Sequence, residues 1–348
     1  MTALEQRSER ILYAIVAEYI ATGEPVGSRT VSKKSDIGLS AASIRNIMSD
    51  LTEWGYIAQP HVSAGRVPTD RGYRLYVDRM VQPGPPNAED QAAIESWILS
   101  AGPDVRDLMK KSSSVLAVLS KQAGVVATAA SAEQTFKNID FIKIADDRIL
   151  VVLVSGTGFV QNRIIQDEDA LNQETLDRYS RMLNDMLKDL DLAQARERIG
   201  QELQHERILV DAALAKVLRY GHIILSRDDS REIFIEGQTN ILDDPEFAQV
   251  ERLRSLLLTF EEKTNLLKIL DKTIEAGRVQ ILIGSEHGVD EIESCSIIAY
   301  PILTDKSPVG CIAVIGPKRM DYHRLVRLVD GTAQVLTRVL RHSSDSSL

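Results

Sequence analysis

Hydrophobic residues between positions 40 and 54 recur with the spacing of an α-helix. One apolar stripe at the i, i+3, i+4 and i+7 positions consists of Ile44, Ile47, Met48, Leu51 and Trp54. With about 100° of rotation per residue, the opposite face is small and polar. That face consists of Ala42, Asn46 and Ser49, flanked by Ser43 and Arg45. The pattern predicts an amphipathic helix whose outer face meets a polar partner.

The side chains of this outer face suit the major groove of DNA. Arginine bonds bidentately to guanine, asparagine bonds to adenine, and a small side chain such as Ala42 fits against a thymine methyl group. We predict that Arg45 and Asn46 read base edges and that Ser43 and Ser49 reach phosphates or base edges. In the alternative interpretation, Asn46 is an indifferent polar residue on the surface.

Three helices are predicted before residue 55. The first runs from about residue 4 to residue 21 and ends where Gly and Pro follow at residues 23–25, because together they stop a helix. Ser28 opens a short second helix through Lys34, a turn follows at residues 36–39, and Ser40 caps the third helix. Helix, short helix, turn and amphipathic helix is the order of a helix-turn-helix.

A hairpin and a fourth helix follow. Residues 56–58 are predicted to form a strand, and Gly65 is predicted at the tip of a hairpin that returns through Val67. The fourth helix starts at Thr69. Its inward face is predicted to carry Tyr73, Tyr76, Val77 and Met80. Residues 1–82 are therefore predicted to form a winged-helix DNA-binding domain.

A stiff linker separates this domain from the rest of the chain. Residues 83–88 are Pro-rich and fit neither a helix nor a central strand. The later pattern predicts helices at 89–100 and 105–123, strands at 141–144, 148–154 and 159–165, a helical stretch at 172–218, strands at 222–225 and 231–235, helices at 245–258 and 260–276, strands at 279–283, 296–302 and 310–314, and a last helix at 322–340.

Sheet, helical interruption and sheet again predict one α+β domain with an insertion. Its first part is placed at 89–170, the insertion at 171–238 and its second part at 239–348. The insertion carries a hydrophobic stripe of Leu176, Tyr179, Met182, Leu183, Met186 and Leu190. Two interpretations of this stripe stay open: it forms a dimer seam, or it packs on its own sheet.

The charge distribution favours a nucleic-acid partner for the first domain only. The net charge of the chain is −9. Residues 1–82 hold ten basic and nine acidic residues, which leaves +1 there and −10 in the remainder. Between Ser28 and Met48, four basic residues face a single acid, Asp36. Such a patch on an acidic body can bind phosphates, although a solvated face explains Lys33 and Lys34 equally well.

Cysteine usage and hydropathy indicate a cytoplasmic protein. Two cysteines in 348 residues argue against a disulfide framework and for a reducing compartment. The purest apolar run, residues 149–154, has the length of a strand, and no run approaches the roughly 18 residues of a membrane span. The N-terminal residues lack the apolar core of a signal peptide. No membrane partner is predicted.

Enzyme chemistry finds no support in the motifs. Cys295 follows His287 and Asp290, but a lone cysteine at the start of an apolar strand is typically a small buried residue. Residues 156–158 lack the remaining glycine and the helix of a phosphate loop. Six scattered histidines offer no metal-ligand spacing. We therefore expect a protein that is not an enzyme, with no catalytic residue, metal or cofactor.

Four segments of the chain resemble one known family, the bacterial heat-inducible transcription repressors called HrcA. They are Ser43–Asn46, Ser63–Arg74, Ile283–Glu286 and Gly316–Tyr322, and they occur in this order. The resemblance covers essentially the whole chain. It implies a winged helix, a GAF-like α+β domain and a dimerisation domain inserted in the latter. It also implies a homodimer on an inverted-repeat operator ahead of chaperonin and chaperone genes, with the chaperonin keeping the repressor folded.

The resemblance and the helix face together give a set of predicted DNA contacts. Arg66, beside Gly65, is expected to reach the minor groove or its phosphates, although a solvated hairpin tip is the alternative. The whole set is Arg29, Lys33, Lys34, Ser40, Ala42, Ser43, Arg45, Asn46, Ser49, Ser63, Gly65, Arg66 and Arg71.

The alternative function is a ligand-sensing winged-helix repressor whose GAF-like domain binds a small-molecule effector. Because a fold alone does not establish function, a screen against metabolites would separate the two readings. A metabolite that both stabilises the protein and releases DNA would favour the ligand-sensing alternative.

Overall fold

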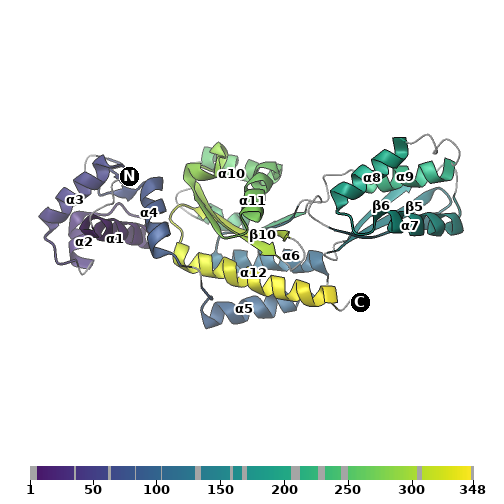
Figure 1. Ribbon diagram of the computed structural model, residues 1–348. Helices are drawn as coiled ribbons and strands as arrows, with labels where there is room; N and C mark the ends of the chain where they lie inside the picture. Colours follow the sequence, from purple (N-terminus) through teal and green to yellow (C-terminus); the bar gives the residue numbers. More distant parts are fainter. Residues whose placement is uncertain are drawn as a thin grey trace.

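Three units follow one another along an elongated molecule: a head, a body and an inserted unit (Figure 1). The computed structural model describes residues 6–34, 37–61, 64–82, 84–102, 104–129, 135–156, 160–166, 171–204, 212–225, 232–243, 250–303 and 308–345. The chain has a mixed α+β architecture in which the helical head precedes two separate sheets with their own helices.

The head contains four helices and a two-stranded hairpin. Its elements are α1 (Gln6–Thr22), α2 (Ser28–Lys34), α3 (Ala41–Glu53), β1 (Ile57–Ala58), β2 (Val67–Pro68) and α4 (Asp70–Met80). The antiparallel register pairs Ile57 with Pro68 and Ala58 with Val67. The predicted order of elements is confirmed, because the apolar stripes of α1, α3 and α4 meet in one core around Ile11, Ile44 and Val77.

Two predicted core positions of the head are wrong. Trp54 is 44% exposed because α3 ends at Glu53 and the tryptophan is its C-cap. The apolar pattern in the sequence therefore continues one residue beyond the helix. Met80 is 47% exposed because it is the last residue of α4, one turn beyond the buried Val77.

The body is a five-stranded antiparallel sheet with helices on both faces. Its strand order is β7-β3-β10-β9-β8, with β3 (Ala123–Thr128), β7 (Ile233–Glu236), β8 (Gln280–Ile283), β9 (Cys295–Leu303) and β10 (Pro308–Pro317). One face is covered by α6 (Val105–Ser120) and α12 (Tyr322–Asp345), and α5 (Ala88–Leu99) packs on the outer side of these two helices. The other is covered by α10 (Val250–Glu262) and α11 (Thr264–Ala276) (Figure 1). Short 3-10 helices occupy Gln238–Asp243, Gly284–His287 and Asp290–Ile292.

Alternate residues of the central strands point to opposite faces, as the pleat requires. Val126 and Ile312 join the core under α6 and α12, whereas Val125 and Ala313 join the core under α11. The sequence pattern predicts a helix that ends at residue 123 and no strand after it, so it misses β3. All six residues of β3 are buried, and a short continuous apolar run cannot be told from a buried helix by periodicity.

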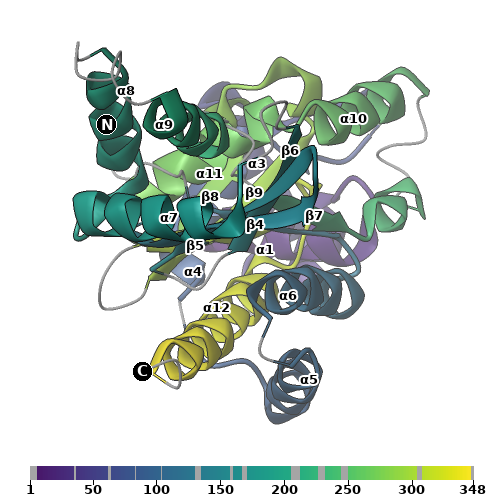
Figure 2. The ribbon, with the colours of Figure 1, turned by 90° about the vertical axis from the view of Figure 1, so that its right-hand side faces the viewer.

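The inserted unit is a separate sheet with its own helices and core. Strands β4 (Phe136–Ala145), β5 (Arg148–Ser155) and β6 (Val160–Gln166) form an antiparallel meander. Helices α7 (Gln173–Leu187), α8 (Leu192–Gln204) and α9 (Ala212–Leu225) pack with it (Figure 2). The predicted strand at 222–225 is wrong, because these residues are the last turn of α9.

The unit begins earlier than predicted. The sequence pattern places the meander in the body and starts the insertion at residue 171, but the strands of the meander share a core with α7 and α9. The flanking body strands β3 and β7 pair directly, with Gly124 opposite Glu236. The structure also decides between the two interpretations of the stripe on α7, in favour of packing on its own sheet. Leu176, Tyr179 and Leu183 are buried against the sheet of their own unit.

Candidate nucleic-acid interface

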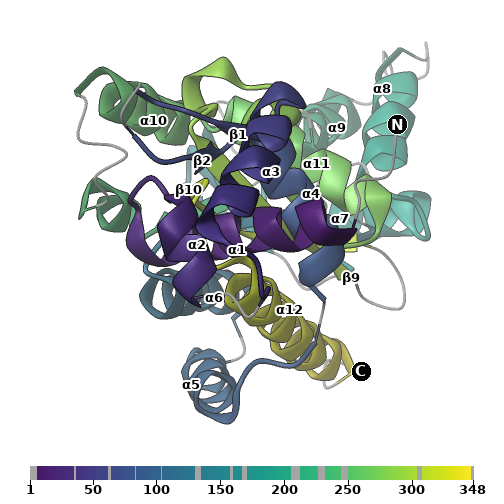
Figure 3. The ribbon, with the colours of Figure 1, turned by 90° about the vertical axis from the view of Figure 1, so that its left-hand side faces the viewer.

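Helix α3 lies in the head, at the end of the molecule remote from the body (Figure 1), and Figure 3 shows this end of the molecule facing the viewer. Ser40 is its N-cap, and the Ser40 hydroxyl accepts a hydrogen bond from the Ser43 N–H at 3.2 Å. Ile44, Met48 and Leu51 are buried in the head core. The opposite side chains are all exposed, as predicted: Ala42, Ser43, Arg45, Asn46 and Ser49. The core stripe therefore fixes which face of α3 meets solvent.

Helix α2 contributes basic residues next to α3, against which it packs. Arg29 and Lys33 are exposed. Lys34 is also exposed, but its ammonium group lies 2.7 Å from a carboxylate oxygen of Glu18 on α1. The turn between α2 and α3 is held by the Ser32 hydroxyl, which donates to the Leu39 carbonyl at 3.1 Å. Two of the three predicted α2 cations are thus without an ion-pair partner among the described residues.

The hairpin differs from the predicted wing tip. Gly65 and Arg66 do not lie at the tip but on the returning chain, where Arg66 and Val26 exchange two backbone hydrogen bonds of 2.8 Å. A Cβ on Gly65 would lie 2.5 Å from the Pro25 carbonyl oxygen, so close backbone packing requires this glycine. The Ala64 N–H closes a turn to the His61 carbonyl. Ser63 lies outside the described residues.

Two predicted DNA-contacting arginines hold α3 instead of pointing freely into solvent. The Arg66 Nε donates to the Thr52 hydroxyl of α3 at 3.1 Å. The Arg71 Nη1 donates to the Trp54 carbonyl at 2.9 Å, and its guanidinium lies 4.5 Å from the centre of the Tyr56 ring. A cation on the last carbonyls of a helix satisfies their lone pairs and the helix dipole. The sequence pattern showed these arginines as basic residues but not their partners.

The N-cap of α3 gives a first prediction. Ser40→Ala removes the acceptor for the Ser43 N–H and is expected to lower the free energy of unfolding of the head by about 1 kcal/mol. Ser49→Ala, on the exposed face of the same helix, is the matched control and is expected to leave stability unchanged. Thermal unfolding followed by circular dichroism measures both, and equal melting temperatures for the two variants would contradict the capping role.

Of the residues considered for enzyme chemistry, Cys295 and His287 are buried in the body and Asp290 is exposed. Cys295 is fully buried at the start of β9. His287 is 4% exposed, and its Nδ1 accepts a hydrogen bond from the Val289 N–H at 3.3 Å. Burial raises the pKa of the other thiol, Cys311. Within the described ranges, no group of three His, Cys, Asp or Glu residues is arranged to hold a metal ion. The helices of those ranges include none with the length and apolarity of a membrane span.

The polar face of α3, with an arginine and an asparagine at the far end of a multidomain chain, is the arrangement expected of a DNA-binding regulator. Residues 106–326 match the family described as HrcA protein C terminal domain. The chain is 39% identical over 347 residues to the heat-inducible transcription repressor HrcA of Syntrophobacter fumaroxidans, covering 99% of this chain and 100% of that relative. It is 42% identical over 340 residues to the repressor of that name from Geobacter sulfurreducens, covering 98% and 99%.

The fold has a solved counterpart. The crystal structure of a hypothetical protein, at 2.2 Å resolution, superposes with a TM-score of 0.65 at 23% identity and covers 98% of this chain and all of that one. This similarity concerns the fold alone. With the family match over residues 106–326 and the near full-length relatives, the chain belongs to the HrcA family of heat-inducible transcription repressors.

Proposed function

We propose that this chain represses chaperonin and chaperone operons in the cytoplasm by binding an inverted-repeat operator as a homodimer. The head acts as a winged helix-turn-helix with α3 as its recognition helix. The observation that carries this proposal is the exposed face of α3, where Arg45 and Asn46 stand one residue apart with no acid between Ala42 and Ser49. Those two side-chain types form bidentate bonds to guanine and adenine in the major groove.

The contacts of the head divide the predicted residues into two roles. Arg45, Asn46 and Ser49 are exposed and placed to meet base edges or phosphates, as is Ser43, whose hydroxyl lies 3.0 Å from that of Ser40, and Arg29 and Lys33 are placed to meet the DNA backbone. Arg66 and Arg71 act through α3, because their guanidinium groups bond to Thr52 and to the Trp54 carbonyl. Their contribution is to hold the angle at which α3 enters the groove.

Dimerisation is proposed to use the open face of the inserted sheet. One face of that sheet is covered by α7 and α9, and the other carries aliphatic side chains that are exposed or half-buried. They are Ile142, Leu150, Val152, Val154, Val160 and Ile164. The registers place Leu150 between Ile142 and Ile164. An apolar face of this kind is typical of a protein–protein contact. One recognition helix reads only a few base pairs, so two heads are needed for a full site.

This dimer surface gives a second prediction. Ile164→Lys places a charge on the open face, where Ile164 is 57% exposed, and is expected to convert the dimer to a monomer. Leu99→Lys is the control, since Leu99 is 65% exposed at the end of α5 in the body. Sedimentation equilibrium compares the two variants. A dimeric Ile164→Lys protein would contradict the proposed seam.

The five-stranded body, with helices on both faces, is proposed as the GAF-like domain, and the chaperonin as the partner that keeps the repressor folded. The chaperonin comes from the family resemblance alone. Adding chaperonin and ATP to the purified repressor is therefore expected to raise the fraction of protein that binds the operator, whereas an unchanged fraction would remove this partner from the proposal.

In vitro selection from a random duplex library tests the proposed function as a whole. Full-length protein is expected to enrich sequences with two inverted half-sites separated by a whole number of helical turns. Enrichment of one unrepeated site would contradict the paired heads, and no enrichment would contradict sequence-specific binding.

A further inference from the structure

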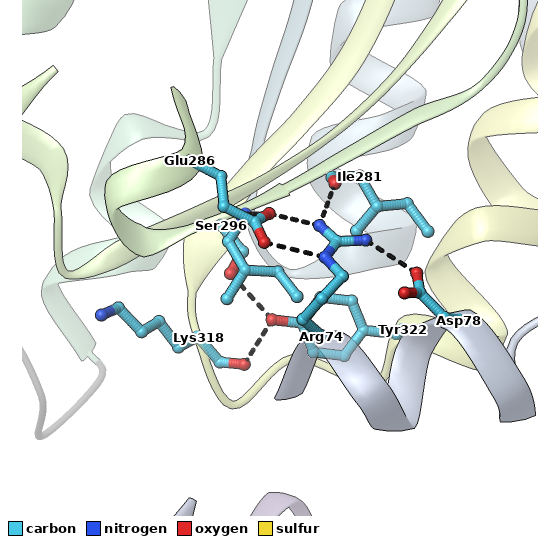
Figure 4. Close-up of polar contacts among 8 residues, drawn as sticks. Arg74, Asp78, Ile281, Glu286, Ser296, Lys318 and Tyr322 are labelled. Carbon is cyan, nitrogen blue, oxygen red and sulfur yellow. Dashed lines mark hydrogen bonds and ion pairs between the residues drawn. The ribbon is translucent and has the colours of Figure 1, made fainter. Parts of the chain in front are cut away.

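Three of the four sequence segments that carry the family resemblance meet at one place, the joint between head and body. The first segment ends at Arg74 on α4, Glu286 lies in the 3-10 helix after β8, and Lys318–Tyr322 leads into α12 (Figure 4). Residues more than 200 positions apart in the chain thus form one cluster. These three segments do not belong to the face of α3 that is proposed to read DNA, so the proposed function gives them no role.

Arg74 is the centre of the joint. Its Nε donates to Glu286 Oε1 at 2.8 Å, and its Nη2 donates to Glu286 Oε2 and to the Ile281 carbonyl. Its Nη1 donates to Asp78 on the same helix at 3.1 Å. The Arg74 side chain is 29% exposed and that of Glu286 is 32% exposed. A two-pronged, charge-assisted pair of this kind fixes an orientation as well as a distance.

The pairing with Arg74 lowers the pKa of Glu286. Burial by itself would raise the pKa of Glu286, but the hydrogen bonds from Arg74 and the Ile283 N–H outweigh it, so the pKa lies below its ordinary value. Because the pKa is lower in the folded protein, the pair stabilises the joint above the ordinary carboxyl range and loses that effect as the pH falls through the lowered pKa. The Arg74–Glu286 pair is therefore formed at neutral pH.

A second ion pair lies on the other side of Glu286. Lys318 Nζ lies 2.5 Å from Asp70 Oδ1 at the start of α4. Gly284 lies against this pair with a φ of +55°, and a Cβ there would approach Asp70 Oδ2 to 2.1 Å and Lys318 Nζ to 2.7 Å. Only glycine combines this backbone conformation with such a close approach. The segment Ile283–Glu286 is thus shaped to receive the first turn of α4.

Apolar packing continues from head to body beneath the two pairs. The rings of Tyr73 and Tyr322 lie 6.1 Å apart between centroids. Tyr322 is fully buried, and its hydroxyl donates to the Lys318 carbonyl and is bonded to the Ser296 hydroxyl, each at 2.7 Å. Head residues and body residues accordingly belong to one continuous hydrophobic core.

We propose that this joint, formed by Asp70, Arg74, Gly284, Glu286, Lys318 and Tyr322, locks the head to the body in one orientation and thereby determines which half-site spacing a dimer accepts. The inference rests on the proposed function for the existence of two half-sites. Two rigidly held heads match a single separation between half-sites, whereas two flexibly tethered heads can bind half-sites at several separations. Arg74 and Lys318 are positioning residues, because they act on DNA through the head.

Spacer-variant operators test the proposal. The double variant Arg74→Gln/Lys318→Met releases both ion pairs, and Arg79→Gln is the control, since Arg79 lies on the same helix but faces Glu9 within the head. The wild-type protein and the control are expected to lose at least about tenfold in affinity when the spacer is lengthened by about two base pairs. The double variant is expected to lose less than about threefold, with its affinity for a single half-site unchanged. Equal spacer losses in all three proteins would overturn the joint while leaving sequence-specific repression standing.

A measurement without DNA tests the head–body joint independently of the proposed DNA-binding function. Spin labels at Ala21→Cys in the head and Glu275→Cys in the body report the head–body distance, in protomers diluted with unlabelled protein. A narrow distance distribution is expected for the wild type and a broad one for the double variant. A narrow distribution in both would overturn the lock. Equal binding of wild-type protein to operator and scrambled duplex would instead refute the proposed function, and with it the spacing rule.

Discussion

Arg45→Ala is expected to weaken binding to the selected operator by about tenfold to a hundredfold while leaving binding to scrambled duplex nearly unchanged. The loss corresponds to about 1–3 kcal/mol, the contribution of one good bidentate contact to a base. Arg45 is exposed on α3 and lies outside the head core, so its removal leaves the fold intact. Asn46→Ala is expected to do the same at a different base. Fluorescence anisotropy on operators substituted one position at a time measures both losses.

The matched control for these two variants is Lys33→Ala on α2. Lys33 is exposed and is proposed to contact phosphate, which carries no sequence information. Its removal is expected to weaken binding to all duplexes alike and to reduce the slope of log affinity against log salt by about one. If Arg45→Ala weakened binding to the operator and to scrambled duplex equally, Arg45 would contact phosphate as Lys33 is proposed to do. The proposal that Arg45 on α3 reads bases would then be wrong.

Gly72→Ala is expected to destabilise the head by about 1–3 kcal/mol, which for a domain of this size lowers the melting temperature by roughly 4–8 °C per kcal/mol. Gly72 is buried in the first turn of α4, where a Cβ would lie 2.2 Å from the Tyr56 carbonyl oxygen. The atom in the way is backbone, so β1 or α4 must shift. Operator affinity is expected to fall with stability, because Thr69 and Arg71 of the same turn contact Tyr56 and Trp54.

Gly200→Ala provides the comparison. Gly200 lies inside α8 with no atom within 4 Å of the added methyl group. Alanine is the better helix former by about 0.5–1 kcal/mol, so this change is expected to be neutral or stabilising. Differential scanning calorimetry of the two variants separates the clash from the general effect of adding a methyl group. A Gly72→Ala protein as stable as Gly200→Ala would contradict the close packing of α4 on the Tyr56 backbone.

Helix α3 was predictable because its signal is local. The spacing of Ile44, Met48 and Leu51 fixes the buried face, and Ser40 marks the start of the helix. Trp54 was misplaced because periodicity does not show where a helix stops. The roles of Arg66 and Arg71 were also hidden, since their partners lie 14 to 17 residues away and meet them only through the packing of the hairpin and α4.

The division of the body could not be predicted from local pattern. Strands β4 to β6 were assigned to the body by their order in the chain, yet their buried residues, such as Ile139 and Val151, face α7 and α9. Which sheet a strand joins depends on pairing between distant segments, such as β3 with β7. The joint was hidden for the same reason, although its residues were already visible as motifs around Arg74, Glu286 and Lys318.

Whether the exposed face of α3 reads DNA sequence is decided by the specificity ratio of the wild-type protein. Dissociation constants are measured at one physiological salt concentration for the selected inverted repeat and for a scrambled duplex of the same composition. The repeat is expected to bind at least about a thousandfold more tightly, as in specific protein–DNA complexes generally. Equal dissociation constants for the two duplexes would contradict sequence reading by α3.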